Sequence, residues 1–322
     1  MKTQDKTRIN TRNGVLACLA VMTLGLAQAQ PCSVKRVGTT PLVKDGSHFL
    51  MPATVNGAPV HFLVDTGAVT SSIDAKVAAQ LALPSLPGRT TQLIGTDGGR
   101  GKRVPKVSIW TLGFGGLAHG AVELAAPDRP DQAGPLTQGI IGADVLSRYD
   151  LEFDFSGRQL NLYTVDGCDA GSAQFQPWQQ PYDTVNLKIA EAKGFEHIAS
   201  LPITVDNQAL EMALDTGATR TKVMLGAAVK LGLDEEQLKA QSPKSTSHSS
   251  SGVAMANYAR RFDSIQIGQS SYRNVELKFS EIDVKPYDGL LGLDFLGSRK
   301  IWISYATRQL FIDKPEHQSM KR

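Results

Sequence analysis

The sequence predicts an all-β protein with short helices, built from two related lobes. Two observations carry this prediction. The triplet Asp-Thr-Gly occurs at residues 65–67 and again at residues 215–217, each time after an apolar run and before an alanine. The segments that follow the two triplets also match, mostly at the same offset of 150 residues. The chain therefore repeats a whole domain and not only a short motif.

Each half is expected to contain the same series of elements. A β-rich opening, residues 50–64 and 203–214, leads into the Asp-Thr-Gly turn. A short helix rich in alanine and leucine follows, with Ser72 and Thr221 as its expected caps. A hairpin region, a Gly-apolar-apolar-Gly strand, a brief helix and two final strands complete the half.

The end of each half carries a clear repeat. Gly-Ile-Ile-Gly-Ala-Asp-Val-Leu at residues 139–146 matches Gly-Leu-Leu-Gly-Leu-Asp-Phe-Leu at residues 289–296. The offset slips only in the middle of each half, where loop insertions and deletions cancel. The predicted organisation is a leader at residues 1–29, an N-terminal lobe at 30–165, a linker at 166–183 and a C-terminal lobe at 184–322.

The first 29 residues have the pattern of a secretory signal peptide. Basic residues precede an apolar segment at 15–26, and Ala27-Gln28-Ala29 supplies the small residues of a cleavage site. We therefore expect cleavage after Ala29, a periplasmic or secreted protein, and no stable membrane insertion afterwards. The alternatives are an uncleaved anchor and lipid attachment at Cys18, which lies too early in the apolar segment.

Removal of the leader changes the charge balance of the chain. The leader carries four basic residues (Lys2, Lys6, Arg8 and Arg12) against one acidic residue, Asp5. The formal net charge therefore falls from +3 to zero when it leaves. A neutral mature chain argues against nucleic acid or an anionic membrane as a partner.

Two cysteines remain, Cys32 and Cys168, immediately before and after the first lobe. In an oxidising compartment we expect them to form a disulfide that closes this lobe, the alternative being two free thiols. The six histidines have no metal-ligand spacing, and no serine-nucleophile or phosphate-binding motif occurs. We expect no metal and no cofactor.

Asp-Thr-Gly-Ala after an apolar strand, with the later Gly-Ile-Ile-Gly-Ala-Asp-Val-Leu, resembles the retropepsin-like aspartic proteases. The resemblance covers about residues 42–163 and 184–313. It implies two acid-protease β-barrel lobes related by pseudo-two-fold symmetry. Most retroviral members supply one lobe per chain and dimerise, whereas here both lobes share a chain, so we expect a monomer. Residues 30–39 leave no room for the long pro-segment of pepsin-like zymogens.

The resemblance assigns catalysis to Asp65 and Asp215. Two carboxyl groups held close together share one proton, so that one acts as a general base toward water and the other hydrogen-bonds the scissile carbonyl. Thr66 and Thr216 would hydrogen-bond across the lobe interface. Gly67 and Gly217 would support the pair by letting the backbone turn tightly beneath the carboxylates.

Glycines in the hairpin region of the first lobe suit a mobile flap over the substrate: Gly95, Gly98 and Gly99. An ordinary exposed hairpin turn explains them equally well. The polar run at residues 242–252 is the counterpart in the second lobe, and it is either a second flap or a loop.

The expected function is aspartic endopeptidase activity on peptide or protein substrates. One alternative is a non-catalytic protein that keeps the cleft to bind peptides. Another is a glycosidase with paired carboxylates, which leaves the duplicated setting unexplained. Ala68 and Ala218 lack the hydroxyl that could stabilise an ionised pair, so we expect an activity optimum at weakly acidic or neutral pH.

Overall fold

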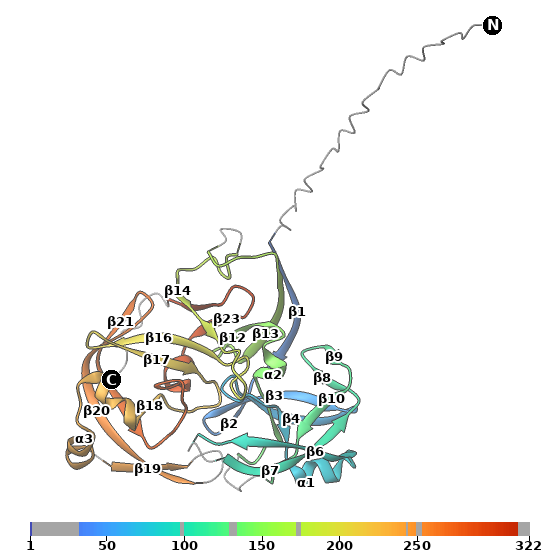
Figure 1. Ribbon diagram of the computed structural model, residues 1–322, viewed down its shortest axis with the longest axis horizontal. Helices are drawn as coiled ribbons and strands as arrows, with labels where there is room; N and C mark the ends of the chain where they lie inside the picture. The colour runs from blue at the N-terminus through green and yellow to red at the C-terminus, as the bar shows by residue number, and fades with distance from the viewer. Residues whose placement is uncertain are drawn as a thin grey trace. The chain divides into compact units, whose positions relative to one another are not determined.

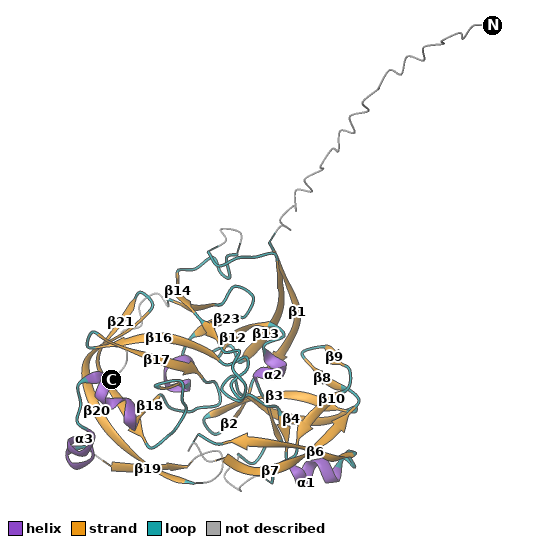
Figure 2. Ribbon diagram, in the orientation of Figure 1, coloured by secondary structure: helices purple, strands orange, loops and turns teal. Residues whose placement is uncertain are grey.

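The computed structural model describes residues 1, 32–96, 100–128, 134–171, 175–242, 244–248 and 253–314 of the chain. The chain divides into two compact units, residues 1–30 and 31–322, and the description below concerns the second. Beyond Met1, the predicted signal peptide lies outside the described residues. Strands make up 52% of the structure and helices 11%, which confirms the predicted all-β class with short helices (Figure 2).

The first lobe is built on a sheet of ten strands, in the order β6-β7-β10-β5-β11-β4-β3-β8-β9, with β2 paired to β3. Its strands are β2 (Val43–Asp45), β3 (His48–Val55), β4 (Ala58–Val64), β5 (Ser72–Ile73), β6 (Ser85–Ile94), β7 (Arg100–Ile109), β8 (Leu112–Phe114), β9 (Leu117–His119), β10 (Val122–Ala125) and β11 (Gly139–Ile141).

The second lobe is built on a sheet of eight strands, in the order β15-β16-β17-β22-β18-β21-β20-β19. Its strands are β15 (Lys188–Ile189), β16 (Ala199–Val205), β17 (Gln208–Leu214), β18 (Lys222–Met224), β19 (Lys244–His248), β20 (Ala254–Ile267), β21 (Ser270–Ser280) and β22 (Gly289–Leu291).

The two lobes close their sheets to different degrees. In the second lobe the long strand β20 also pairs with β16, which closes a ring of six strands. In the first lobe, the segment equivalent to β20 is divided into two strands, β7 and β8. At the break, the Asn56 side chain accepts hydrogen bonds from the N–H groups of Trp110 and Thr111, at 2.7 and 3.1 Å. The first lobe is therefore a half-barrel.

A third sheet takes strands from both halves of the chain, in the order β1-β13-β12-β23-β24-β14. At its centre β12 pairs antiparallel with β23, so the matching segments predicted from the repeat lie side by side (Figure 1). Its strands are β1 (Ser33–Pro41), β12 (Asp150–Asp154), β13 (Gln159–Asp166), β14 (Tyr182–Asn186), β23 (Lys300–Ser304) and β24 (Gln309–Asp313).

The helices are short, as predicted, but their caps differ from the prediction. Ser72 lies in β5, and Thr221 immediately precedes β18, so neither begins a helix. A strand inserted after each triplet displaces the helix along the chain, and Asp74 caps the first one through the Lys76 N–H. The helices are α1 (Ala75–Gln80), α2 (Ala143–Leu146), α3 (Glu235–Gln241), α4 (Leu293–Leu296) and the 3₁₀ helix η1 (Leu225–Leu231).

The predicted disulfide between Cys32 and Cys168 is confirmed, and it closes the first lobe. Cys168 packs on the third sheet in a small cluster with Phe175, Trp302 and Phe311. Most other buried apolar side chains form one continuous core that extends through both lobes. Within the described residues, no helix has the length and apolar character needed to cross a bilayer.

Candidate active site

The two Asp-Thr-Gly triplets occupy equivalent places at the ends of β4 and β17. Each of these strands pairs in parallel with the Gly-apolar-apolar-Gly strand of its own lobe, β11 or β22. The backbone N–H of Asp65 donates to the carbonyl of Ile141, and that of Asp215 donates to the carbonyl of Leu291, both at 3.0 Å. The same backbone pattern thus presents one carboxyl group from each lobe.

The structure brings the two carboxyl groups together. The side chains of Asp65 and Asp215 are hydrogen-bonded to each other. A Cβ atom on Gly67 would lie 2.5 Å from Cγ of Asp215, and one on Gly217 would collide with the Asp65 carboxyl. The glycines were predicted to permit a tight turn. The structure gives a further reason for them, because each lies against the carboxyl group of the opposite lobe.

Backbone donors hold each carboxyl group in one orientation. In both lobes, the N–H groups two and three positions after the aspartate donate to its Oδ1 atom. The distances are 2.9 Å from Gly67 and 2.9 Å from Ala68 to Asp65, and 2.8 Å from Gly217 and 2.9 Å from Ala218 to Asp215.

Burial raises the proton affinity of both aspartates. Burial raises the pKa of Asp65 well above its usual range, and the charge and hydrogen bond of Asp215 raise it further. Burial also raises the pKa of Asp215, but backbone N–H groups, the hydrogen bond from Asp65 and the charge of His48 oppose this rise. The two carboxyl groups therefore share one proton and titrate as a pair, and the charge of His48 favours the ionised form of Asp215.

Thr66 and Thr216 join the lobes beneath the carboxyl groups, where both are buried. The Thr66 hydroxyl donates to the Leu214 carbonyl at 2.7 Å and accepts the Thr216 N–H at 3.1 Å. The Thr216 hydroxyl donates to the Val64 carbonyl at 2.8 Å and accepts the Thr66 N–H at 3.1 Å. This reciprocal network matches the arrangement expected from the resemblance.

A second pair of contacts was missed in the sequence. The Ser71 hydroxyl donates to Asp144 at 2.6 Å and accepts the Gly142 N–H at 2.9 Å. The Thr221 hydroxyl makes the same contacts in the second lobe, donating to Asp294 at 2.7 Å. These contacts tie the loop after each triplet to the start of the short helix. The sequence did contain a signal for these contacts, because the aspartate in Gly-apolar-apolar-Gly-x-Asp occurs in both halves.

The hairpin predicted as a flap is formed by β6 and β7. Gly95 immediately follows β6, whereas Gly98 and Gly99 lie outside the described residues. The carbonyl of Thr96 accepts a hydrogen bond of 2.9 Å from the N–H of Asp283 in the second lobe. The hairpin therefore reaches across to the other lobe. In the second lobe, β19 pairs with β20, and their connection also lies outside the described residues.

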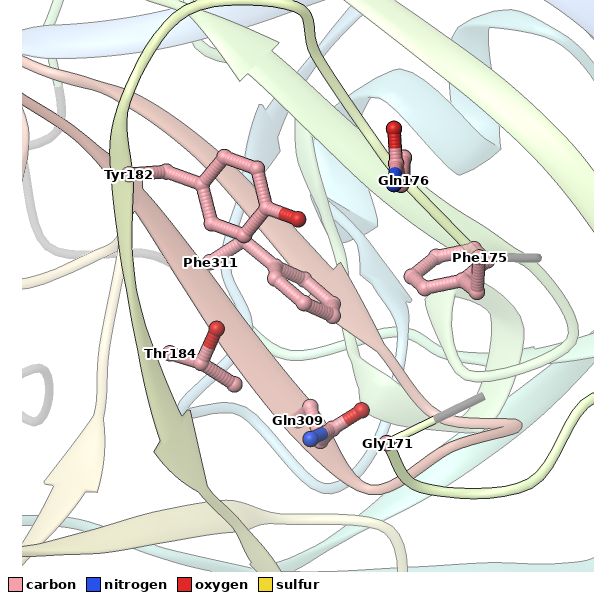
Figure 3. A pocket seen from close by; sticks show the side chains of 7 residues that line it. All are labelled: Gly171, Phe175, Gln176, Tyr182, Thr184, Gln309 and Phe311. Carbon is pink, nitrogen blue, oxygen red and sulfur yellow. The ribbon is translucent and has the colours of Figure 1, made fainter. Parts of the chain in front are cut away.

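A separate hollow of about 380 Å³ lies on the third sheet, away from the aspartates. Figure 3 shows Tyr182, Phe311 and Phe175 around it, together with amide and hydroxyl side chains. The described residues that line it include no carboxylate and no basic side chain. In the described part of the chain, no cluster of three or more His, Cys, Asp or Glu residues could hold a metal ion.

Comparison with known families gives a match for each half of the chain. Residues 51–145 match the aspartyl protease family, and residues 201–298 match the gag-polyprotein aspartyl proteases. The two matches contain Asp65 and Asp215, respectively, in equivalent positions. No curated protein matches the chain.

Proposed function

The chain belongs to the retropepsin-like aspartyl protease family, and from this premise we propose that it is an aspartic endopeptidase. The reaction is peptide-bond hydrolysis by a water molecule activated between Asp65 and Asp215. The observation that carries the proposal is the direct hydrogen bond between these two carboxyl groups, which come from equivalent strands of the two lobes.

We assign the ionised role to Asp215, because the charge of His48 favours the ionised form of this aspartate. The ionised Asp215 accepts a proton from water as the water oxygen bonds to the scissile carbonyl carbon. The protonated Asp65 donates to the carbonyl oxygen, which produces a gem-diol intermediate. Asp215 then gives its new proton to the amide nitrogen while Asp65 takes a proton from one gem-diol hydroxyl. The carbon–nitrogen bond breaks, which leaves a carboxylic acid, an amine and the aspartate pair in its starting state. The backbone donors and the threonine network keep the reacting oxygens in place throughout.

The test is peptide cleavage by the mature protein and by Asp65→Asn and Asp215→Asn. Each substitution removes half of the acid–base pair, so kcat should fall by about 10²–10⁴-fold or more. Asp263→Asn, at an exposed position of the second lobe, serves as the matched control and should retain full activity. Full turnover by either active-site variant would contradict the proposal. Peptide binding without hydrolysis by the wild-type protein would instead favour a non-catalytic binding protein.

The same variants make a prediction about stability. A carboxyl group whose pKa is higher in the folded state binds more protons there than in the unfolded chain. The stability that the group contributes is fully present below its pKa in the unfolded chain. This stability is lost as the pH rises through its pKa in the folded protein. Asp65→Asn removes this loss, so the variant should melt at a higher temperature than wild type at neutral pH.

We also propose that the protein acts as a monomer in the periplasm or outside the cell, after cleavage behind Ala29. The Cys32–Cys168 disulfide supports an oxidising compartment, because such bonds are rare in the cytosol. N-terminal sequencing of the mature protein tests the cleavage site. One chain supplies both aspartates, so a monomer contains the complete pair. The molecular mass measured in solution tests whether the protein is a monomer.

A further inference from the structure

The two lobes differ at one pair of equivalent positions close to the aspartates. In the first lobe, β5 and β10 run parallel, and Ser72 is paired with Ala125. In the second lobe, β18 and β21 run parallel in the same way, and Lys222 is paired with Lys278. Ser72 and Ala125 are buried, whereas both lysines are half-buried. Two small side chains in one lobe are thus replaced by two cations in the other.

The register places the two lysines on one face of the sheet. The next pair along these strands, Val223 with Phe279, belongs to the hydrophobic core. Paired residues on neighbouring strands share a face, and like charges in this relation repel each other. Burial lowers the pKa of Lys222, and the charge of Lys278 lowers it further. The arrangement is therefore unfavourable unless something supplies negative charge.

The described residues do not supply that charge at close range. Lys222 Nζ donates to the hydroxyl of Ser247 at 2.9 Å, a neutral partner in β19. Neither lysine belongs to any ion pair found in the described parts of the chain. Asp215 acts on Lys222 only through its charge, which raises the lysine pKa against the effect of burial.

Lys222 lies near Asp215, whose charge acts on it. Lys222 is paired with Leu290 in β22, and the carbonyl of the next residue, Leu291, accepts the Asp215 N–H at 3.0 Å. Ser247 lies in the hairpin that corresponds to the flap of the first lobe. A peptide that places its scissile carbonyl at the two aspartates therefore passes close to Lys222.

We propose that Lys222 and Lys278 form a subsite for a carboxylate of the peptide substrate. This inference rests on the endopeptidase function proposed above. The carboxylate is either an acidic side chain or the C-terminus of the peptide. The negative charge of the carboxylate offsets the two positive charges of the half-buried amines. A charge-assisted hydrogen bond from Lys222 favours the carboxylate over a neutral group of the same shape. Because the first lobe has Ser72 and Ala125 at these positions, only one side of the cleft recognises the anion.

The experiment compares peptide pairs that differ only by Glu against Gln at each position flanking the scissile bond. A further pair differs by a free or an amidated C-terminus, which separates the two sources of carboxylate. Wild-type protein should prefer one acidic peptide by about tenfold or more in kcat/KM. Lys222→Met should abolish this preference, so that the ratio of kcat/KM between the acidic and the neutral peptide falls to about one. Lys278→Met should reduce the preference.

Lys244→Met is the control, since it removes one positive charge from an exposed position on the same hairpin. It should keep the preference for the acidic peptide. Equal cleavage of every pair by wild type, or an unchanged preference in Lys222→Met, would overturn the subsite. If no peptide is cleaved, the endopeptidase function fails. Binding of the acidic and neutral peptides to wild type and Lys222→Met then decides the subsite separately.

Discussion

The two lobes share a backbone but differ in the side chains that surround their aspartates. Ser72 and Ala125 in the first lobe correspond to Lys222 and Lys278 in the second. These positions tolerate substitution because the strand pairing that supports each triplet is made by backbone groups and not by these side chains. Duplication therefore preserves the arrangement of the two Asp-Thr-Gly triplets and leaves the surrounding charges free to diverge.

A second difference acts on the aspartates themselves. His48 at the start of β3 interacts with the backbone of Gly217 and with the charge of Asp215. Its equivalent in the second lobe is Ile198, a buried apolar residue. Of the two aspartates, Asp215 is the one whose pKa the charge of His48 lowers. The two carboxyl groups are equivalent in backbone position but have different neighbours.

The largest effect that would break the symmetry of the site is expected from Gly67→Ala or Gly217→Ala. Either methyl group would collide with the carboxyl group of the opposite lobe and force the two aspartates apart. A displacement of this kind should lower kcat/KM by about 10²-fold or more. Gly226→Ala is the control, because a Cβ there meets open space. Activity close to wild type in both active-site variants would show that the aspartates do not act as a contacting pair.

A smaller effect, on stability, would sharpen the contrast between the lobes. The disulfide encloses the first lobe, and its cysteines are separated by 136 residues. Replacing both Cys32 and Cys168 with Ser should reduce the free energy of unfolding by about 2–5 kcal/mol, measured by denaturant titration. The loss should appear with intact catalytic geometry at low temperature, because the aspartates lie on other strands. Unchanged stability would mean that the bond does not constrain the unfolded chain.

The smallest effect is expected from His48→Ile, which makes the first lobe resemble the second. The charge of His48 lowers the pKa of Asp215, so its removal should raise that pKa. The acid limb of the kcat/KM profile should then move to higher pH. His248→Ile removes an exposed histidine as a control.

The wild-type profile provides the reference for this comparison. Burial raises the pKa of both aspartates, and the alanines after the triplets offer no hydroxyl to oppose it. We therefore expect an optimum at weakly acidic or neutral pH. A maximum below about pH 3 would contradict this expectation, and an acid limb unmoved by His48→Ile would remove the role assigned to that residue.

The sequence by itself was sufficient to predict the duplication, the pair of aspartates that meet between the lobes and the all-β class. These predictions follow from repeated local patterns. An apolar strand, a turn triplet and a glycine-flanked strand can each be recognised from a few consecutive residues. The helix caps at Ser72 and Thr221 were wrong for the same reason. Two or three residues that form a strand cannot be distinguished locally from the start of a helix, and their pairing with distant strands decides between the two.

Only the tertiary structure decided which side chains meet across the lobes. The contact of Gly67 with Asp215, the charge of His48 beside that same aspartate and the pairing of Lys222 with Lys278 all join segments far apart in the chain. The proton affinities of Asp65 and Asp215 depend on burial and on these neighbours, which a linear sequence does not contain. Identical triplets thus acquire unequal chemistry because folding places each in a different electrostatic environment.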